Sequence, residues 1–448
     1  MKKAGPYSHL YESRRGERGF RSLLLLAVRL ACITLVWGQS NAWPTVVALQ
    51  GDGKIVRIGA SDHGFTVVRY TPDGSLDASF GTEGKVITRI GTDPEIEDEA
   101  HALALQTDGK IVVVGRTWHS YNNDIAVVRY NTDGSLDASF GKGGKVITDL
   151  SADYDDAFAL AVQTDGKLVV GGLATDGIAL VRYNPDGSLD FSFNSRVMIT
   201  RSKVAKIVVH ALAVQSDGKI VVVGRSSYNR GRNSEFALVR YNPDGSLDMS
   251  FSAGRMVTTQ VGTVDIVTDV VIQPDGKLVV VGTSFNGRSI DFAMVRYNPD
   301  GRLDTSFGTG GTVTSDFCAH RVGKQYADAL GSGSISGGWG VVLQTDNKIL
   351  VTGVPSNVLC HGFVLLRYNP DGSPDSTFGE NGRVTTPIGT RDGYSSALAL
   401  QGDGKIVVVG TSLEGFALVR YNPNGRLDTS FGKGGKVTTR IGTDYTAQ

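Results

Sequence analysis

The stretch Gln106-Thr-Asp-Gly-Lys110, which runs into Ile111-Val-Val-Val-Gly115, decides the fold because the chain repeats it. The segment continues through Val128-Arg-Tyr130 and Asp133-Gly-Ser-Leu-Asp-Ala-Ser-Phe140 to Gly144-Lys-Val146. Copies of its opening glutamine stand at Gln50, Gln106, Gln163, Gln215, Gln273, Gln344 and Gln401. The spacings are 56, 57, 52, 58, 71 and 57 residues. A period of this length indicates a repeat architecture in which each copy is one structural unit.

Each copy contains four segments with the composition of β-strands. In the second copy, residues 102–105 are small and alternating, and Asp108-Gly109 after them predicts a two-residue hairpin turn. Residues 111–114 are apolar on both faces and end at a glycine in every copy, which indicates a close backbone approach. Residues 125–130 have the alternating pattern of a β-strand, and residues 145–148 are the most polar of the four segments. Four antiparallel strands graded in this way are typical of a propeller blade, so we predict an all-β, seven-bladed β-propeller. An array of β-sandwiches would need longer repeats.

Three motifs recur in order over residues 43–443. They are Gln-x-Asp-Gly-Lys-Ile-Val-Val-Val-Gly, Phe-Ala-Leu-Val-Arg-Tyr-Asn-Pro-Asp-Gly-Ser-Leu-Asp and Ser-Phe-Gly-x-Gly-Gly-Lys-Val. Together they resemble the delta-60 repeat of bacterial secreted and surface proteins. The resemblance implies a β-propeller of undetermined function, and it brings no catalytic residues with it.

The first 42 residues differ from the repeats. Basic residues up to Arg21 precede the apolar runs 23–28 and 30–37, and the small residues Ser40 and Ala42 follow. This order predicts a signal peptide over residues 1–42, cleaved after Ala42. The alternative is a retained membrane anchor, but Arg29 interrupts the apolar run. We therefore expect a single propeller over residues 43–443, a short tail at 444–448, no membrane span in the mature chain, and export to the periplasm, the cell surface or the medium.

The charge balance and the missing motifs exclude some functions. Lys plus Arg and Asp plus Glu are both 45, so no overall field attracts nucleic acid. No Ser-His-Asp order, Gly-x-Ser-x-Gly, Walker loop or dinucleotide fingerprint occurs. His101 and His210 each begin a first segment, and we interpret them as turn residues. We predict a monomer that is not an enzyme and that uses no metal and no cofactor.

An arginine and an aspartate recur together in all seven copies. Among these pairs are Arg129 with Asp137, Arg240 with Asp248, and Arg420 with Asp428. They could form a ring of ligand contacts, or they could be structural ion pairs within each blade. Because binding sites are rarely repeated seven times, we favour the structural role. Runs such as Asn131, Asp133 and Asp137 resemble calcium loops, but they lack the distal glutamate of an EF-hand, so we predict Asx-type turns.

Two cysteines remain after removal of the predicted signal peptide, Cys318 and Cys360. A disulfide between them is the simplest interpretation in an oxidising compartment. Free thiols, or a metal site with His320 and His361, are the alternatives that the sequence leaves open.

The loops between the second and third segments, and those between copies, vary in length and chemistry. Variable loops on a rigid scaffold are a usual place for binding. The 71-residue spacing contains an insertion at residues 327–338 on the same face. The candidate ligand contacts in these loops are Trp118, Tyr121, Tyr154, Tyr228, Arg230, Arg232 and Phe285. We therefore predict a binding scaffold for an unknown protein or glycan. The alternatives are a hydrolase or lyase with its site at the axial mouth, and a purely structural surface module.

Overall fold

The computed structural model describes thirteen stretches of the chain. They are residues 46–59, 64–91, 98–119, 122–151, 154–174, 177–193, 197–201, 206–228, 233–316, 339–353, 362–389, 393–412 and 414–440. All of them lie in the unit that spans residues 42–448. The predicted signal peptide, the tail, Tyr121, Arg230, Arg232, Cys318, Cys360 and the insertion at 327–338 fall outside the described residues. Within the described stretches, no helix is long and apolar enough to cross a membrane.

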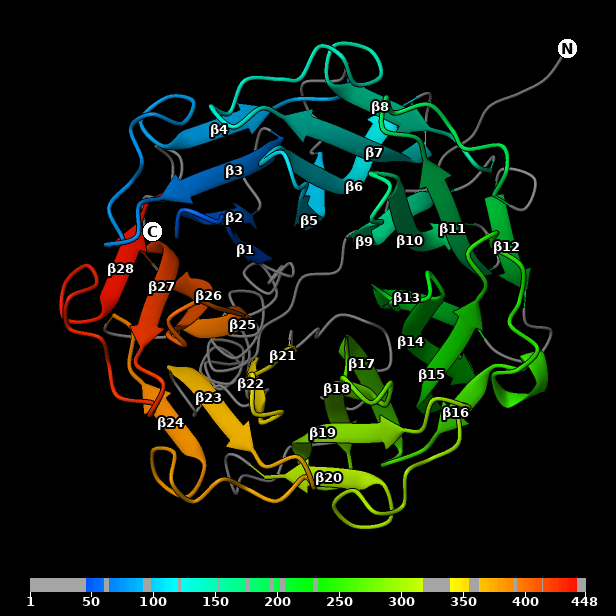
Figure 1. Ribbon diagram of the computed structural model, residues 1–448, viewed down its shortest axis with the longest axis vertical. Helices are drawn as coiled ribbons and strands as arrows, with labels where there is room; N and C mark the ends of the chain where they lie inside the picture. The colour runs from blue at the N-terminus through cyan, green and yellow to red at the C-terminus, as the bar shows by residue number, and fades with distance from the viewer. Residues whose placement is uncertain are drawn as a thin grey trace, which may run out of the picture. The chain divides into compact units, whose positions relative to one another are not determined.

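The strands of the first four repeats, which we call blades 1 to 4, follow one another along the chain (Figure 1). Blade 1 contains β1 (Val47–Leu49), β2 (Ile55–Gly59), β3 (Phe65–Tyr70) and β4 (Lys85–Thr88). Blade 2 contains β5 (Glu99–Leu105), β6 (Ile111–His119), β7 (Asn122–Tyr130) and β8 (Lys145–Thr148). Blade 3 contains β9 (Asp155–Val162), β10 (Leu168–Ala174), β11 (Gly177–Tyr183) and β12 (Val197–Arg201). Blade 4 contains β13 (Lys206–Val214), β14 (Ile220–Tyr228), β15 (Asn233–Tyr241) and β16 (Val257–Thr259), with the 3-10 turn η2 (Ser252–Gly254) before β16.

The last three repeats form blades 5 to 7. Blade 5 contains β17 (Val264–Ile272), β18 (Leu278–Phe285), β19 (Ile290–Tyr297) and β20 (Thr312–Ser315). Blade 6 contains β21 (Trp339–Leu343), β22 (Ile349–Gly353), β23 (Phe363–Tyr368) and β24 (Arg383–Thr386). Blade 7 contains β25 (Tyr394–Leu400), β26 (Ile406–Ser412), β27 (Gly415–Tyr421) and β28 (Lys436–Thr439).

Within each blade, consecutive strands pair antiparallel in chain order. Blades 4 and 5 are joined into one eight-stranded sheet by a single parallel bridge between Ser234 and Val264. The first strands of the blades lie nearest the centre of the ring and the fourth strands at its rim (Figure 1). The second and third strands are almost wholly buried, and their apolar side chains form clusters shared by neighbouring blades. The core therefore lies between the blades, as the apolar second segment of each repeat predicts.

The hairpin turn after each first strand differs from the predicted two-residue turn. The Gly109 N–H donates to the Gln106 carbonyl and the Gln106 N–H to the Lys110 carbonyl, both at 2.9 Å. Within this turn only Gly109 has a positive φ, of 82°. The turn therefore has three residues and ends in a left-handed glycine, because Asp108 accepts the Lys110 N–H through its carboxylate instead of adopting positive φ. In blade 6, Asn347 takes the glycine's place with φ of 62°.

Five first strands carry one extra residue, a β-bulge. The register shifts opposite the recurring glycine of the second strand, as between Ala100 and Ala102 in blade 2, and the second strand continues beyond this glycine, as β6 does from Gly115 to His119. The extra residues are His101, Phe158, His210, Thr268 and Ser396. A Cβ on Gly115 would lie 1.8 Å from the Glu99 carbonyl oxygen, so the bulge requires this glycine. The close approach predicted at the recurring glycine is confirmed, and the interpretation of His101 and His210 as turn residues is wrong, because both lie within strands.

Blade 1 packs directly on blade 7. Val68 and Tyr70 share a buried cluster with Val407 and Leu418, and the Gly432 N–H donates to the Asp73 carbonyl at 2.8 Å. Among the described residues, no strand passes from one of these sheets to the other. In the described part of the chain, blade 1 is therefore joined to blade 7 by packing.

Arg57 of blade 1 lies in the contact between blades 1 and 7. It is fully buried, stands 3.6 Å from the centre of the Phe416 ring, and donates to the Gly410 carbonyl at 3.0 Å. Burial lowers the pKa of Arg57 to about 9.

Candidate functional site

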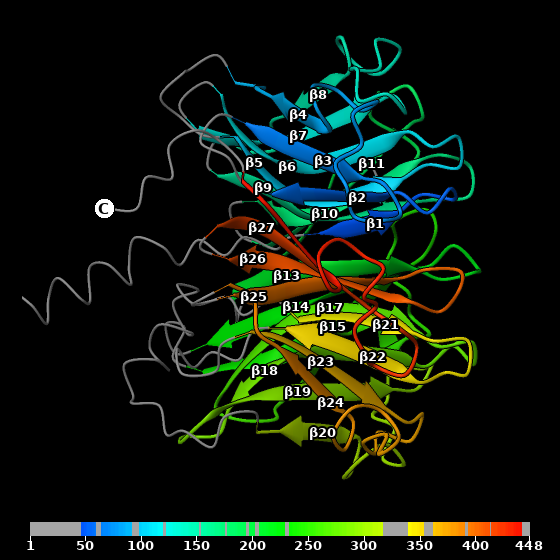
Figure 2. The ribbon, with the colours of Figure 1, turned by 90° about the vertical axis from the view of Figure 1, so that its left-hand side faces the viewer.

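The two faces of the ring differ in how regular they are. Strands within a blade alternate in direction, so the turns between strands 1 and 2 and between strands 3 and 4 lie on one face (Figure 2, right). We call this face the constant face, because its turns share one sequence. The loops between strands 2 and 3, and those between blades, lie on the opposite face, which we call the variable-loop face.

Charged side chains on the constant face form a clamp within and between blades. Arg129 Nε lies 2.7 Å from Asp137 Oδ2, and Lys110 Nζ lies 3.3 Å from the same oxygen. Arg129 also donates to the Pro185 carbonyl of blade 3 at 2.5 Å, and its guanidinium stands 4.5 Å from the centre of the Phe140 ring. The arginine thus joins its own blade to the next one, which extends the role within the blade that the sequence suggested.

The same clamp occurs in every blade. Its Lys, Arg and Asp are Lys54, Arg69 and Asp77; Lys110, Arg129 and Asp137; Lys167, Arg182 and Asp190; Lys219, Arg240 and Asp248; Lys277, Arg296 and Asp304; Lys348, Arg367 and Asp375; and Lys405, Arg420 and Asp428. The carbonyl acceptors in the following blades are those of Thr132, Pro185, Pro243, Pro299, Pro370, Pro423 and Pro72. The last bond, from Arg420 to Pro72, closes the ring.

The aspartate of the clamp is held ionised. Burial opposes the ionisation of Asp137, but hydrogen bonds from Ser139, the charge of Arg129 and a hydrogen bond from Lys110 outweigh it and lower the pKa of Asp137 to about 2. Asp133 in the preceding turn accepts the Ser135 N–H at 2.9 Å. These carboxylates are therefore engaged within turns, in the Asx-type arrangement expected from the sequence. A shallow polar groove between blades 1 and 2 is lined largely by clamp and turn residues, such as Lys54 and Arg69.

A second charged cluster lies at the opposite end of the inner strands, where they begin at the variable-loop face. His101 of blade 2 is 1% exposed. Its Nδ1 lies 3.0 Å from Asp156 Oδ1 and its Nε2 lies 3.4 Å from Glu99 Oε2. Arg116 bonds to the other Glu99 oxygen, and its Nη1 lies 3.4 Å from Asp156 Oδ2. The cluster joins blades 2 and 3 through two carboxylates, one imidazole and one guanidinium.

The cluster fixes the charge and orientation of its histidine. Burial opposes protonation of His101, but the charge and hydrogen bond of Asp156, together with Glu99, outweigh it and raise the pKa of His101 to about 9. The imidazolium can then donate from Nδ1 to the Ala157 carbonyl at 3.0 Å, beside the Asp156 carboxylate, and from Nε2 to Glu99. Its ring also stacks on Phe158 of blade 3, with 5.1 Å between the ring centres and 11° between the planes.

Blade 4 places a histidine and an arginine at the corresponding positions in a different environment. His210 is the bulge residue of β13, and Arg225 follows Gly224 as Arg116 follows Gly115. Burial and the Arg225 charge lower the pKa of His210 to about 3. Its Nε2 is buried and has no hydrogen-bond partner among the described residues. His210 is therefore a neutral imidazole, whereas His101 is an imidazolium.

The remaining blades do not repeat these charges. One first-strand position lies opposite the residue that follows the recurring glycine of the second strand. It holds Glu99 in blade 2 and Asp156 in blade 3, but Val208, Ile266 and Tyr394 in blades 4, 5 and 7. At the bulge, blades 5 and 7 have Thr268 and Ser396. Sequence reasoning missed Glu99, Arg116 and Asp156. A comparison of the copies at the bulge and at the strand pair beside it would have found them, because blades 5 and 7 have uncharged residues at these positions. We call Glu99, His101, Arg116, Asp156, Phe158, His210 and Arg225 the axial cluster.

The contacts predicted on the variable-loop face have mixed outcomes. Tyr154 is 61% exposed, and Trp118 and Tyr228 are half-buried at the ends of β6 and β14. Phe285 does not fit the prediction, because it is buried and packs on Val264 and Ile266. Trp118, Tyr154 and Tyr228 belong to blades 2, 3 and 4, with no contact among them in the described part of the chain, and the other three candidates lie outside the described residues.

Three carboxylates near this face could approach a cation. Ligand oxygens of Asp124, Asp149 and Asp155 lie within 4.8 Å of one another. Asp155 accepts the N–H groups of Leu150 and Ser151 at 2.7 and 2.9 Å. Burial, assisted by the charge of Asp149, raises the pKa of Asp155. Asp98 and Asp265 accept loop N–H groups in the same way in blades 2 and 5, so Asp155 has a structural role in organising the loop before its blade.

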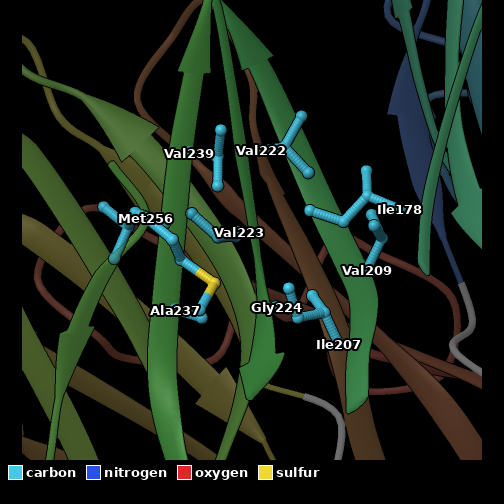
Figure 3. A pocket seen from close by; sticks show the side chains of 10 residues that line it. Ile178, Ile207, Val209, Val222, Val223, Gly224, Ala237, Val239 and Met256 are labelled. Atoms are coloured by element: carbon cyan, nitrogen blue, oxygen red, sulfur yellow. The ribbon is translucent and has the colours of Figure 1, made fainter. Parts of the chain in front are cut away.

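An enclosed gap between blades 3 and 4 is not a binding site. It is lined by apolar groups, including Ile178, Val209 and Val222, and the Met256 side chain points into it (Figure 3). It has no room for a water molecule. It is a packing defect between β11 of blade 3 and the strands of blade 4.

The repeat and the ring define the class of this protein as a β-propeller of seven repeats. The chain belongs to the family described as "Domain of unknown function (DUF5122) beta-propeller". The matches cover residues 50–80, 106–140, 163–193, 215–251, 273–307, 344–378 and 401–431, which is just over half of the chain. No curated protein matches it.

Several solved structures are similar in shape but distant in sequence. An inactive variant of virginiamycin B lyase from Staphylococcus aureus, with quinupristin, is 10% identical, with 83% of this chain and 93% of that chain covered and a TM-score of 0.45. The ulvan lyase of polysaccharide lyase family PL25 is 11% identical, with 86% and 96% covered and a TM-score of 0.47. PorZ of Porphyromonas gingivalis, a surface component of the type-IX secretion system, is 10% identical, with 85% and 49% covered and a TM-score of 0.42. Likenesses of this degree carry no argument about function.

Proposed function

We propose that this protein is an exported β-propeller that binds a glycan or protein ligand at the variable-loop face, over the axial cluster. The observation that carries the proposal is a break in the repeat beside the recurring glycine. Among the five blades with a described bulge, the bulge position and the strand pair beside it (Glu99 with Arg116 in blade 2) carry ionisable side chains in blades 2 to 4 and uncharged ones in blades 5 and 7. Burying a charged group is unfavourable unless it is paired. Since blades 5 and 7 make the same bulge with Thr268 and Ser396, the fold itself does not require these charges.

The location supports a binding role. The cluster lies where the inner strands begin, next to the loops that differ between copies. Half-buried Glu99 and Arg116 offer hydrogen-bonding groups around the half-buried ring of Phe158, and one aromatic face among a few polar groups is typical of small-ligand sites. Export through residues 1–42, a monomeric state and kinship with the delta-60 repeats belong to the same proposal and rest on the sequence.

A glycan and peptide array tests the proposal. The test variant combines Glu99→Ile, His101→Thr and Arg116→Thr, which converts blade 2 to the residues of blade 5 at the same positions. The unchanged protein should bind one glycan or peptide class, and the variant should lose that binding while keeping its thermal unfolding midpoint within a few degrees. Binding that survives in the folded variant, or no binding by the unchanged protein, would contradict the proposal.

Acid–base chemistry at the same place is a second candidate function. Two carboxylates beside an imidazole favour it. Against it, His101 is 1% exposed and both of its nitrogens are engaged, an arrangement that suits positioning better than proton transfer to a substrate. An assay for new reducing or unsaturated ends, after incubation with the glycans that bind, distinguishes catalysis from binding alone. New ends that disappear in Glu99→Gln would favour the enzyme.

A further inference from the structure

Two side chains of blade 5 bond to the inner strand of blade 6. Thr268 Oγ1 donates to the Trp339 carbonyl at 2.9 Å, and the Val341 N–H donates to Asp269 Oδ2 at 3.0 Å. Because β21 is an edge strand of its sheet, these backbone groups have no further strand to pair with on the side away from β22. Thr268 and Asp269 thus supply the donor and the acceptor that a further strand would supply. We call these two bonds the blade 5–6 strap.

The aspartate of the strap departs from the repeat. Asp269 pairs with Val281, the residue before the recurring glycine of β18. The other blades with a described bulge carry alanine at this position, namely Ala102, Ala159, Ala211 and Ala397. Blade 6 carries Gly340 there, and β21 pairs with β22 without a bulge. Since these inner strands form with alanine or glycine, the fold itself does not require a carboxyl group at this position.

The carboxyl group of Asp269 lies in an environment of low polarity. The residue is half-buried, and of the strands packed against β17, β18 and β21 carry no charged side chain. The charged and imidazole side chains described on β17 and on the other strands packed against it are Asp265 of β17, His210 of β13, Arg225 of β14, and Glu235 and Arg240 of β15. None of them shifts the pKa of Asp269. Burial raises this pKa to about 6, against the opposing effect of hydrogen bonds from the N–H groups of Val341 and Val270.

This burial makes the contact between blades 5 and 6 depend on pH. When the contact opens, water reaches the carboxyl group and its pKa returns toward the ordinary value of 3.8. An acid whose pKa is higher in the closed contact holds its proton more tightly there, so protonation favours the closed contact. The stabilisation of the closed contact is therefore fully present below about pH 4 and is lost as the pH rises through about 6.

We propose that Thr268 and Asp269 form a pH-sensitive strap, which holds the inner strand of blade 6 to blade 5 in acid and lets this contact open near neutral pH. The proposal stands on the two bonds across the contact and on a half-buried carboxyl group that replaces the alanine of other blades. It is independent of the proposed binding function, because the strap lies in blades 5 and 6 and the axial cluster lies in blades 2 to 4.

Hydrogen exchange followed by mass spectrometry tests the strap. The measured quantity is the protection factor of the peptide that contains β21, which is the exchange rate of the unfolded peptide divided by that of the protein. Between about pH 4 and about pH 7 it should fall roughly tenfold or more, since a change in pKa from about 6 to 3.8 corresponds to about two orders of magnitude. The peptide of β25 in blade 7, where Ala397 takes the place of the aspartate, should keep its protection.

Three variants separate the titration from the bonds. Asp269→Asn keeps an acceptor for the Val341 N–H but cannot ionise, so its protection factor should not change with pH. Asp269→Ala removes the acceptor and should give low protection of β21 at every pH. Thr268→Val removes only the donor to the Trp339 carbonyl, so it should lower the protection several-fold at every pH and leave the pH dependence in place.

Asp275→Asn is the matched control. It removes a carboxylate of the same blade that is 56% exposed in a turn of the constant face, so its protection factors should equal those of the unchanged protein at each pH. Thermal unfolding of each variant shows whether the propeller is intact. If Asp269→Ala does not fold, the comparison between the unchanged protein and Asp269→Asn decides the question.

Three results overturn the proposal. The first is a protection factor of β21 that stays constant with pH in the unchanged protein. The second is a fall with pH that persists in Asp269→Asn, because another group would then be responsible. The third is an equal fall in the peptides of β21 and β25, which would mean that the whole ring loosens.

Discussion

The constant face and the axial cluster of the variable-loop face both carry buried charges, but they distribute them in opposite ways. The clamp of Lys110, Arg129 and Asp137 has a counterpart in every blade, with Arg–Asp distances of 2.7–2.8 Å. The axial cluster occurs in three consecutive blades and differs in each of them. Charges that recur in every repeat hold the blades together, whereas blades 5 and 7 form the same bulge without the charges of the axial cluster. In a repeat protein, the break in the pattern is the stronger indication of a site.

Removing a clamp arginine should have the largest effect on stability. Arg240→Met breaks the 2.7 Å pair with Asp248 and the 2.7 Å bond to the Pro299 carbonyl of blade 5. It leaves Asp248 buried with Lys219 at 3.6 Å. We expect the free energy of unfolding to fall by about 3–5 kcal/mol, measured by urea titration, because the buried Asp248 carboxylate loses its nearest cation and keeps only the more distant Lys219.

Arg302→Met provides the comparison within the same face. Arg302 pairs with Asp300 at 3.7 Å and is largely exposed, so its loss should not measurably change the urea midpoint. Similar effects of the two substitutions would mean that the clamp does not hold the blades together.

Substitution of the bulge glycine should cause the second largest loss of stability. Gly115→Ala would place a Cβ 1.8 Å from the Glu99 carbonyl oxygen, which forces the inner strand away and disturbs the axial cluster. We expect a loss of about 2–3 kcal/mol by the same titration. Gly51→Ala is the control, since its Cβ meets nothing within 4 Å. Equal losses of stability in Gly115→Ala and Gly51→Ala would show that the bulge accommodates the added Cβ without strain.

The two bulge histidines should respond to pH in opposite directions. The pKa of His101 is raised from 6.5 to about 9. Its stabilising effect is therefore fully present below pH 6.5, declines as the pH rises, and is lost above about 9. The difference between the protein and His101→Gln should reach about 3 kcal/mol at low pH and shrink toward pH 9.

His210 provides the reverse case. Its pKa is lowered to about 3, so the folded protein keeps it neutral while the unfolded chain protonates it below pH 6.5. His210→Gln should therefore become relatively more stable as the pH falls from 7 to 5. Parallel pH profiles for His101→Gln and His210→Gln would contradict the two charge states.

The smallest change in stability should come from a substitution of Arg57, where blade 1 packs on blade 7. Arg57→Val introduces the residue that blade 2 has at the corresponding place, Val113. Two guanidinium nitrogens of Arg57 have no hydrogen-bond partner among the described residues. We expect an increase of about 1 kcal/mol in the free energy of unfolding, because apolar replacement of a buried charge is often stabilising. Val113→Thr should destabilise instead, and a loss of stability in Arg57→Val would show that the arginine is needed for closure.

Much of the fold could be predicted from particular residues, and the site could be predicted only in part. The glycine at position 115 and its counterparts indicated a close approach before the bulge was seen, since only a missing side chain allows it. The turn after Gln106 was assigned the wrong length, because turn type depends on φ at Asp108, which an Asp-Gly pair leaves open. Phe285 was expected to be a contact, yet it packs among Val264 and Ile266.

By itself, the sequence determined the number of blades, the strand order and the recurring ion pairs, because these follow from local patterns that repeat seven times. Tertiary structure alone decided which of those arginines reach the next blade and which charges meet at the axis. Glu99 and Asp156 are 57 positions apart in the chain, and both contact His101 only because two inner strands lie against each other. The charge state of a histidine depends on such neighbours, so two copies of one position became an imidazolium in blade 2 and a neutral ring in blade 4.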